Sequence, residues 1–391
     1  MAEYPRVETL DLLGQLIAFD TISSRSNLHL IDHVASRLAA LGIEHRLLPS
    51  PQGDKANLWA MIGPDVPGGV VLSGHSDVVP VEGQSWDRDP FTLYRDGERL
   101  FGRGTADMKG FLACAVALLE QQRDAPLARP VHLAISYDEE VGCLGAPALI
   151  DWVAARAAPA AIFVGEPTEM QIVNAHKSVT VARTRIAGVE AHSSMAHRGA
   201  SAVGLAGQVI AGLKAIEDEL GESFSDSRFL PERTTISVNR VGGGTAFNIL
   251  AGQAWFEWDV RGIPGADGDT VLERLDAARQ RLVDPVARVH PGVGMTTEII
   301  ANVPPLAPEP GGTAEALARR LLGGGGEEAG TVPYGTEAGQ FQRAGMSTVV
   351  IGPGSMAQGH QANEFVTLAQ IASCEAFLAR LIEALKDPSG V

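Results

Sequence analysis

Hydrophobic residues in the first part of the chain follow two alternating patterns. Residues 7–19 and 29–42 carry apolar side chains at the spacing of amphipathic helices, and Gly42 ends the second of them. Short apolar runs bounded by Gly, Pro or acidic residues are typical of buried strands, and they occur at 69–74, 130–137 and 160–166. Strands that alternate with helices predict an α/β fold, a mostly parallel sheet covered by helices.

The pattern changes at about residue 178, where strands become half polar. Residues 178–303 predict the order strand, helix, strand, strand, helix, strand, which is the ferredoxin-like α+β unit. The α/β pattern returns after Pro304. We therefore expect a first domain formed by 1–177 and 304–391, with a second domain, 178–303, inserted into it.

Composition narrows the class of protein. The chain has 391 residues, 45% of them hydrophobic, which favours a globular protein of more than one domain. The formal net charge of −16 argues against nucleic-acid or anionic-membrane partners. There is no apparent secretory signal or membrane-spanning run. The three cysteines are far apart, as expected for a protein of the reducing cytoplasm.

Acidic residues and histidines follow the predicted strands. Ligands of an open parallel sheet bind beyond the carboxyl ends of its strands. The residues expected there are His75, Asp77, Glu139, Glu140, Glu166 and His360, with Asp107 just before a predicted helix. Taken singly, Asp77 and Asp107 could be turn residues, Glu139 and Glu140 part of a solvated loop, and His360 a surface histidine. Their shared position at one sheet edge favours a common site.

So many carboxylates at one edge would repel one another unless cations neutralised them. Histidine nitrogens and carboxylate oxygens are ligands that Zn²⁺ accepts, and their number favours two divalent ions over one. Co²⁺ or Mn²⁺ would suit the same ligands. Asp77, two residues after His75, is placed to orient that ring. Glu139 and Glu140 should point apart, one toward metal and one toward water, but the sequence does not say which.

Five motifs carry a resemblance to a known family. They are "SGHSDVVPV", "GRGTADMKG", "DEEVGCLGA", "GEPTE" and "GPGSMAQGHQANE". Together they resemble the co-catalytic zinc aminoacylases and peptidases, a family that includes carboxypeptidase G and succinyl-diaminopimelate desuccinylase. The resemblance covers nearly the whole chain. It implies that His75, Asp107 and Glu166 hold one zinc ion, that Asp107, Glu140 and His360 hold the other, and that Glu139 is the general base.

The resemblance also implies roles for residues near and inside the inserted domain. His192 in "EAHSS" would stabilise the oxyanion, although Ala191 stands where the family pattern has glycine. Arg261 would bind a substrate carboxylate, and Asn248 and Thr336 would contact the substrate. Each could instead have only a surface or structural role. The family further implies that the inserted domain forms a homodimer.

Among the subgroups of this family, the motifs "GEPTE", "AHKS" and "YGTEAGQF" are most similar to the acetylornithine deacetylases. This similarity implies a small N-acyl amino acid substrate, N-acetyl-L-ornithine, and a place in arginine biosynthesis. Desuccinylation of succinyl-diaminopimelate or hydrolysis of another N-acyl amino acid is the alternative within the family. A homologue that binds a ligand without catalysis is the alternative outside the enzymes, but no expected ligand or base is missing.

Overall fold

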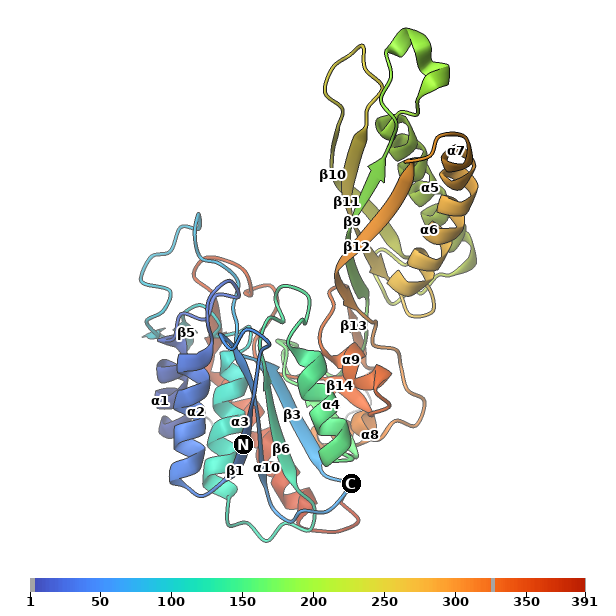
Figure 1. Ribbon diagram of the computed structural model, residues 1–391. Coiled ribbons are helices and arrows are strands. Elements are labelled where there is room, and N and C mark those ends of the chain that lie inside the picture. The colour runs from blue at the N-terminus through green and yellow to red at the C-terminus, as the bar shows by residue number, and fades with distance from the viewer. Residues whose placement is uncertain (1–3, 325–327, 391) are drawn as a thin grey trace. The chain divides into compact units, whose positions relative to one another are not determined.

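The computed structural model describes residues 4–324 and 328–390, and the chain divides into two units (Figure 1). The first unit contains the residues up to Ala175, Pro308–Gly330 and the residues from Thr336 onward. The second contains His176–Ala307 together with Thr331–Gly335. The segment Thr331–Gly335 is grouped with the second unit, although it follows the inserted region in sequence and its residues Thr331 and Val332 belong to strand β13 (Gly330–Val332).

An eight-stranded sheet forms the centre of the first unit. In spatial order its strands are β1 (Glu44–Pro49), β2 (Ala56–Ile62), β6 (Val131–Ser136), β3 (Val70–His75), β7 (Ala161–Val164), β14 (Thr348–Val350), β8 (Val173–His176) and β13 (Gly330–Val332). The neighbours β6, β3, β7 and β14 run parallel, whereas β1, β2 and β8 pair antiparallel. The mostly parallel sheet predicted from the apolar runs is confirmed.

Helices cover both faces of this sheet. On one face a continuous apolar core joins strand residues such as Leu58 and Leu72 to α1 (Val7–Ile17), α2 (Leu28–Ala40), α3 (Lys109–Gln122), α8 (Thr313–Leu321) and α10 (Leu368–Leu385). Trp59 points to the opposite face, where it meets Trp152 of α4 (Ala146–Arg156). The short helix α9 (Ala338–Arg343) contacts α4. A small sheet of β15 (Phe365–Thr367), β5 (Arg99–Phe101) and β4 (Tyr94–Asp96) completes the unit.

The second unit is built on an antiparallel sheet. Its strands in spatial order are β10 (Thr235–Gly243), β11 (Gln253–Gly262), β9 (Ser178–Ala187) and β12 (Gly294–Val303), accompanied by η1 (Ser193–Arg198), α5 (Ala202–Ser223), α6 (Gly268–Leu282) and α7 (Asp284–Val289). Burial alternates along β9 and β11, as it does when helices cover one face of a sheet. The predicted ferredoxin-like order is confirmed: β9, α5, β10, β11, α6, β12.

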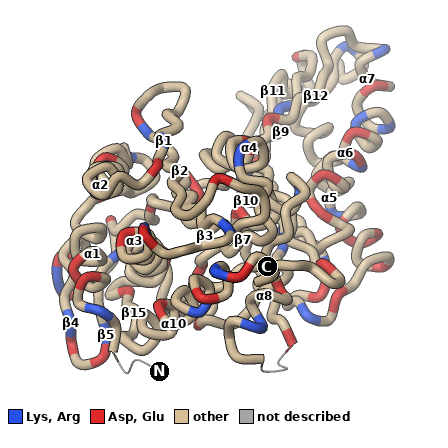
Figure 2. The backbone as a smooth tube through the Cα atoms, turned by 90° about the horizontal axis from the view of Figure 1, so that it is seen from below, with Lys and Arg blue, Asp and Glu red and all other residues tan. Residues whose placement is uncertain are grey.

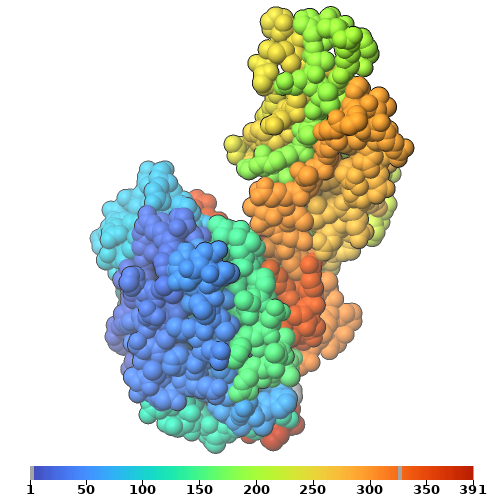
Figure 3. Space-filling view, viewed as in Figure 1, coloured from blue at the N-terminus to red at the C-terminus, as the bar shows by residue number. Residues whose placement is uncertain are grey.

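Charged residues are distributed as the fold requires. The buried strands β3 and β7 contain none, whereas Lys, Arg, Asp and Glu lie along helices such as α5 and α6 and in loops (Figure 2). In the space-filling view the N-terminal part of the chain, in blue, forms a continuous face of the first unit (Figure 3). None of the described helices combines the length and apolar character needed to span a bilayer.

One histidine is part of the apolar packing between the sheet and α4. His132 of β6 is 1% exposed and its ring stacks on Trp59, with 5.7 Å between the ring centroids. In the described part of the chain neither of its ring nitrogens has a hydrogen-bond partner. Burial, together with the charge of Arg156, lowers the pKa of His132 to about 4. The ring is therefore neutral in the folded protein at pH values where an exposed histidine would be charged.

The His132 pKa predicts a specific acid sensitivity. Because the unfolded chain binds this proton at pH 6.5 and the folded protein only near pH 4, stability falls as the pH drops through that window. The loss attributable to His132 is about 2 kcal/mol at pH 5. His132→Phe keeps the stacking and removes the proton site, so its urea midpoint should fall less between pH 7 and pH 5 than that of the wild type. Equal falls in the two proteins would show that this histidine does not carry the effect.

Candidate metal centre

The predicted ligand residues come together at the carboxyl edge of the parallel strands. His75 is the last residue of β3, Glu139 and Glu140 follow β6, and Glu166 follows β7. His360 lies in the loop after β14. The strands β6, β3, β7 and β14 are neighbours in the sheet, so their ends deliver these side chains to one place.

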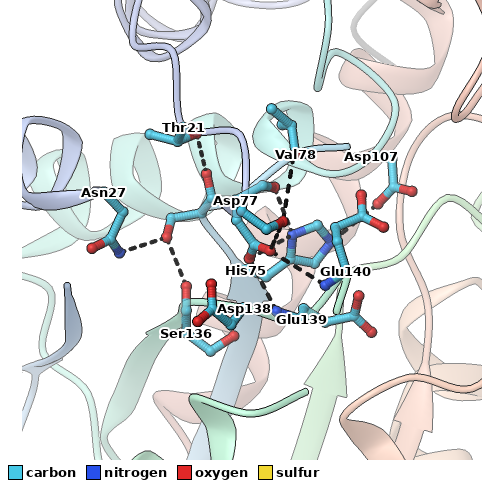
Figure 4. Close-up of polar contacts among 12 residues, drawn as sticks. Thr21, Asn27, His75, Asp77, Val78, Asp107, Ser136, Asp138, Glu139 and Glu140 are labelled. Carbon is cyan, nitrogen blue, oxygen red and sulfur yellow. Dashed lines mark hydrogen bonds and ion pairs between the residues drawn. The ribbon is translucent and has the colours of Figure 1, made fainter. Parts of the chain in front are cut away.

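Asp107 lies at the centre of the cluster and contacts both histidines (Figure 4 shows it with His75 and Glu140). Its Oδ1 is 3.1 Å from His75 Nε2, and its Oδ2 is 3.2 Å from His360 Nε2. Glu166 Oε1 is 3.8 Å from His75 Nε2, and Glu140 Oε2 is 3.0 Å from His360 Nε2. The one carboxylate thus stands between a His75–Glu166 group and a His360–Glu140 group.

The electrostatics of the cluster favour added positive charge. Burial raises the pKa of Glu139 to about 8 and that of Glu140 to about 7, and the nearby Asp107 charge adds to both shifts. Hydrogen bonds to Asp107 and Glu140 raise the pKa of His360 to about 10. Burial opposes the charging of His75, but Asp107 and the other carboxylates outweigh it and set its pKa well above the ordinary value. In the metal-free protein a protonated histidine supplies the positive charge that a bound cation would supply.

The donor set fits divalent metal ions. Two groups, His75 with Glu139 and Glu166, and His75 with Asp107 and Glu140, each bring three ligand atoms within 4.8 Å of one another. Glu140 Oε1 and Glu166 Oε1 are buried and, within the described residues, lack a hydrogen-bond partner. Buried oxygens without a donor are costly unless something binds them. Imidazole and carboxylate ligands suit zinc and similar ions.

Asp77 lies beside His75, but it makes contacts that the sequence did not predict. His75 Nδ1 is 2.9 Å from the Asp77 backbone oxygen and 3.6 Å from its carboxylate, so the carbonyl accepts the ring hydrogen bond (Figure 4). The carboxylate instead accepts from the Ser23 hydroxyl at 2.7 Å and from the backbone N–H groups of Glu139 and Glu140 at 3.1 and 3.3 Å. Asp77 therefore orients His75 through its main chain and the glutamate pair through its side chain.

The two adjacent glutamates point to different partners. Glu140 contacts His360, whereas Glu139 Oε1 is 3.3 Å from the sulfur of Cys143. Burial and the Glu139 charge raise the pKa of the Cys143 thiol, so it acts as a hydrogen-bond donor to the carboxylate. Asp138 precedes the pair with a φ of 58°, and its carboxylate is bound by Lys55. This turn separates the directions of the two glutamates.

Three further buried polar residues surround the cluster, and sequence reasoning did not single them out. Glu337 accepts hydrogen bonds from Ser73 of β3 at 2.5 Å and Ser136 of β6 at 2.7 Å. Glu364 forms an ion pair with Arg103 at 2.7 Å. Arg103 in "GRGTADMKG" and Glu364 in "GHQANE" lie within motifs that carry the family resemblance, and Glu337 lies in "YGTEAGQF", which carries the similarity to the subgroup.

The remaining predicted residues lie in both units. Thr336, in the first, is fully buried, and its hydroxyl accepts a hydrogen bond from the Ala338 N–H. His192 and Asn248 are close together in the second, because the Ser193 N–H donates to the Asn248 oxygen. Arg261 lies on β11 of the second unit and pairs with Asp259 at 3.1 Å.

His192 is exposed and begins the η1 turn. Its Nδ1 accepts a hydrogen bond from the Ser194 N–H at 3.2 Å and lies 2.8 Å from the Ser194 hydroxyl. Since a nitrogen that accepts from a backbone N–H carries no proton, the neutral ring has its proton on Nε2. The outward nitrogen of His192 is therefore a hydrogen-bond donor.

The contacts of the Asp77 carboxylate predict the effect of replacing it with an amide side chain. Asp77→Asn keeps the shape but turns an NH₂ group toward at least one of the donors that the carboxylate now accepts. We expect the affinity for the added zinc to fall about 10- to 100-fold. A zinc titration of the chelator-treated protein measures this, with Ser23→Ala as the mild control because it removes a single donor. Unchanged zinc affinity in Asp77→Asn would show that the carboxylate does not support the cluster.

Comparisons with known proteins agree with this geometry. Residues 71–384 match the model of peptidase family M20/M25/M40. Acetylornithine deacetylases are among the relatives: that of Myxococcus xanthus is 35% identical and that of Proteus mirabilis 33%, over 95% or more of each chain. An M20 family metallo-carboxypeptidase from Sulfolobus solfataricus has the same fold, with a TM-score of 0.72 at 18% identity over 97% of this chain and 99% of that one. The chain is a hydrolase that acts on amide bonds, and it belongs to peptidase family M20/M25/M40.

Proposed function

We propose that this protein is a metal-dependent amidohydrolase that removes the acetyl group from N-acetyl-L-ornithine, giving L-ornithine and acetate in the cytoplasmic pathway of arginine biosynthesis. The observation that carries the reaction class is the Asp107 carboxylate between His75 and His360, at 3.1 and 3.2 Å. The substrate is inferred from the acetylornithine deacetylases that are 32–35% identical over nearly the whole chain.

We assign two divalent ions, Zn²⁺ in the first place and Co²⁺ or Mn²⁺ as substitutes, to this cluster. His75, Asp107 and Glu166 would hold one, and Asp107, Glu140 and His360 the other. A dinuclear metal-binding M20 peptidase from Bacillus subtilis has this fold, with a TM-score of 0.64 at 18% identity. Divalent ions bound by these residues would supply Lewis acidity toward the scissile carbonyl and would lower the pKa of a bound water.

Glu139 would move the proton. The Cys143 thiol holds one of its oxygens and Asp77 holds its backbone N–H, so the side chain is fixed beside the ligands. A carboxylate in this position accepts a proton from the attacking water and delivers it to the nitrogen of the departing amine. Asp77 acts as the positioning residue, because it fixes both His75 and the turn that carries Glu139.

The family resemblance implies further residues that would bind the substrate. His192 would stabilise the oxyanion, and its Nε2 proton, inferred from the Ser194 contacts, supports that role. Arg261 would pair with the substrate carboxylate. Asn248 and Thr336 would contact the substrate, a proposal that rests on the family resemblance.

A homodimer formed by the second unit belongs to the same proposal. Its edge strands β10 and β12 carry apolar side chains that are exposed within the single chain: Val241 at 65%, Ile299 at 49% and Ile300 at 42%. Apolar residues exposed on edge strands are often buried when two protein chains associate. Sedimentation equilibrium measures the mass, and a monomer at micromolar concentration would count against the dimer.

A panel of substrates tests the proposed function directly. The zinc-loaded protein should hydrolyse N-acetyl-L-ornithine faster than N-succinyl-diaminopimelate and simple N-acetyl amino acids, measured as kcat/KM. If another N-acyl amino acid were much faster, the substrate would change while the reaction class stood. A zinc-loaded protein that hydrolysed none of them would favour a ligand-binding homologue.

Two variants separate the proposed catalytic roles from metal binding. Glu139→Gln should lower kcat by about 10²- to 10⁴-fold through loss of proton transfer. His192→Ala should lower it by about 10²- to 10³-fold through loss of an oxyanion donor. His197→Ala, in the same η1 turn, is the matched control and should keep its turnover. Atomic emission should still find two metal ions in each variant, and normal turnover in either of the first two would remove that residue from the mechanism.

A further inference from the structure

Glu364 stands where two ligand-bearing loops meet. It lies four residues after His360, directly before β15, and its side chain is fully buried. Its backbone oxygen accepts from the Gly102 N–H at 3.0 Å, which continues the pairing of β15 with β5. The residue thus belongs to the His360 loop by sequence and to the Asp107 loop by hydrogen bonding.

The carboxylate of Glu364 is occupied by donors from a single segment, 103–107. Oε2 accepts from Arg103 Nη1 at 2.7 Å and from the Gly104 N–H at 3.1 Å. Oε1 accepts from the Ala106 N–H at 2.8 Å and from the Asp107 N–H at 3.1 Å. The Glu364 side chain therefore binds the backbone N–H of Asp107 and the N–H groups of Gly104 and Ala106 before it.

Arg103 extends this connection back to His360. The guanidinium is 1% exposed, lies 5.0 Å from the centre of the Trp86 ring and donates to the Gln84 side-chain oxygen at 2.5 Å. The Gln84 amide in turn donates to the backbone oxygen of His360 at 2.8 Å. A closed series of contacts, Glu364 to Arg103 to Gln84 to His360, joins the two loops.

The simplest alternative is a buried ion pair that only stabilises the fold. Such pairs often contribute little net stability, because removing both charges from water is costly. Here, however, the acceptor is shared with the N–H of Asp107, and His360 adopts a φ of 60°, a backbone region that non-glycine residues seldom occupy without support. These hydrogen bonds hold the backbone of the two ligand residues, Asp107 and His360.

We propose that Glu364 is a positioning residue that joins the Asp107 loop to the His360 loop and so sets the separation of these two ligands before metal binds. The proposal rests on the proposed function only in that Asp107 and His360 hold a metal ion. A carboxylate is needed, because four donors converge on it and an amide offers a single acceptor oxygen. It acts through the ligands and does not itself touch substrate.

The experiment compares Glu364→Gln with a matched control, Glu375→Gln. Glu375 accepts from the Arg6 N–H and the Thr9 hydroxyl, and so joins α10 to the start of α1 instead of two ligand loops. The chelator-treated full-length proteins are titrated with zinc against a chromophoric chelator, and the visible spectrum of the Co²⁺-loaded proteins is recorded. We expect Glu364→Gln to bind at least one ion about 10- to 100-fold more weakly, with an altered Co²⁺ spectrum. Glu375→Gln should match the wild type in both.

Each outcome decides the proposal. A lower thermal midpoint of the metal-free Glu364→Gln protein, with wild-type zinc affinity and Co²⁺ spectrum, would make the residue purely structural and overturn the proposal. If that variant does not fold, Glu364→Asp replaces it, since the shortened carboxylate cannot reach all four donors, and wild-type affinity there overturns the proposal equally. A wild type that binds no zinc would refute the metal assignment itself, whereas two tightly bound ions in both proteins would refute only the role of Glu364.

Discussion

The mutual repulsion of buried carboxylates at one edge of the sheet is the constraint on which the site depends. Glu140 and Glu166 follow strands β6 and β7, Asp107 precedes α3, and the rings of His75 and His360 lie among these three carboxylates. Burial raises the pKa values of Glu139 and Glu140, and the negative charge of Asp107 adds to both shifts. Such a cluster lowers the stability of the metal-free protein. It suits divalent cations, because they neutralise the carboxylates and bind them as ligands. The metal-free protein is thus less stable, but its metal ligands are already held in place.

A second layer of hydrogen bonds keeps the ligands in place. The Asp77 carboxylate accepts from the backbone N–H groups of the glutamate pair, and Glu337 accepts from the hydroxyls of Ser73 on β3 and Ser136 on β6. Glu364 does the same for the loop of Asp107. Backbone amides and hydroxyls satisfy these inner carboxylates, so they can stay buried without a metal of their own. Glu140 Oε1 and Glu166 Oε1, which have no hydrogen-bond partner among the described residues, are left for ions.

Much of this could be predicted from the sequence. Apolar runs and helical spacing predict the mostly parallel sheet and the ferredoxin-like unit. They do so because buried helices and strands repeat apolar residues at characteristic intervals along the sequence. The rule that ligands bind beyond strand ends predicts that His75 and His360 lie at one edge of the sheet, and the structure brings both into contact with Asp107. The sequence does not reveal which atoms form each hydrogen bond. The His75 ring is hydrogen-bonded to the backbone oxygen of Asp77 and not to its carboxylate, and this depends on the geometry of the local turn. The role of Glu364 depends on a pairing between segments about 260 residues apart, which no local pattern reveals.

Anomalous X-ray scattering at the zinc edge from crystals of the zinc-loaded protein tests the central claim most directly. The account predicts two peaks about 3.5–4 Å apart, both in contact with Asp107. One should also contact His75 and Glu166, and the other Glu140 and His360. No peak at the cluster, or a single peak at full zinc loading that does not involve Asp107, would contradict it.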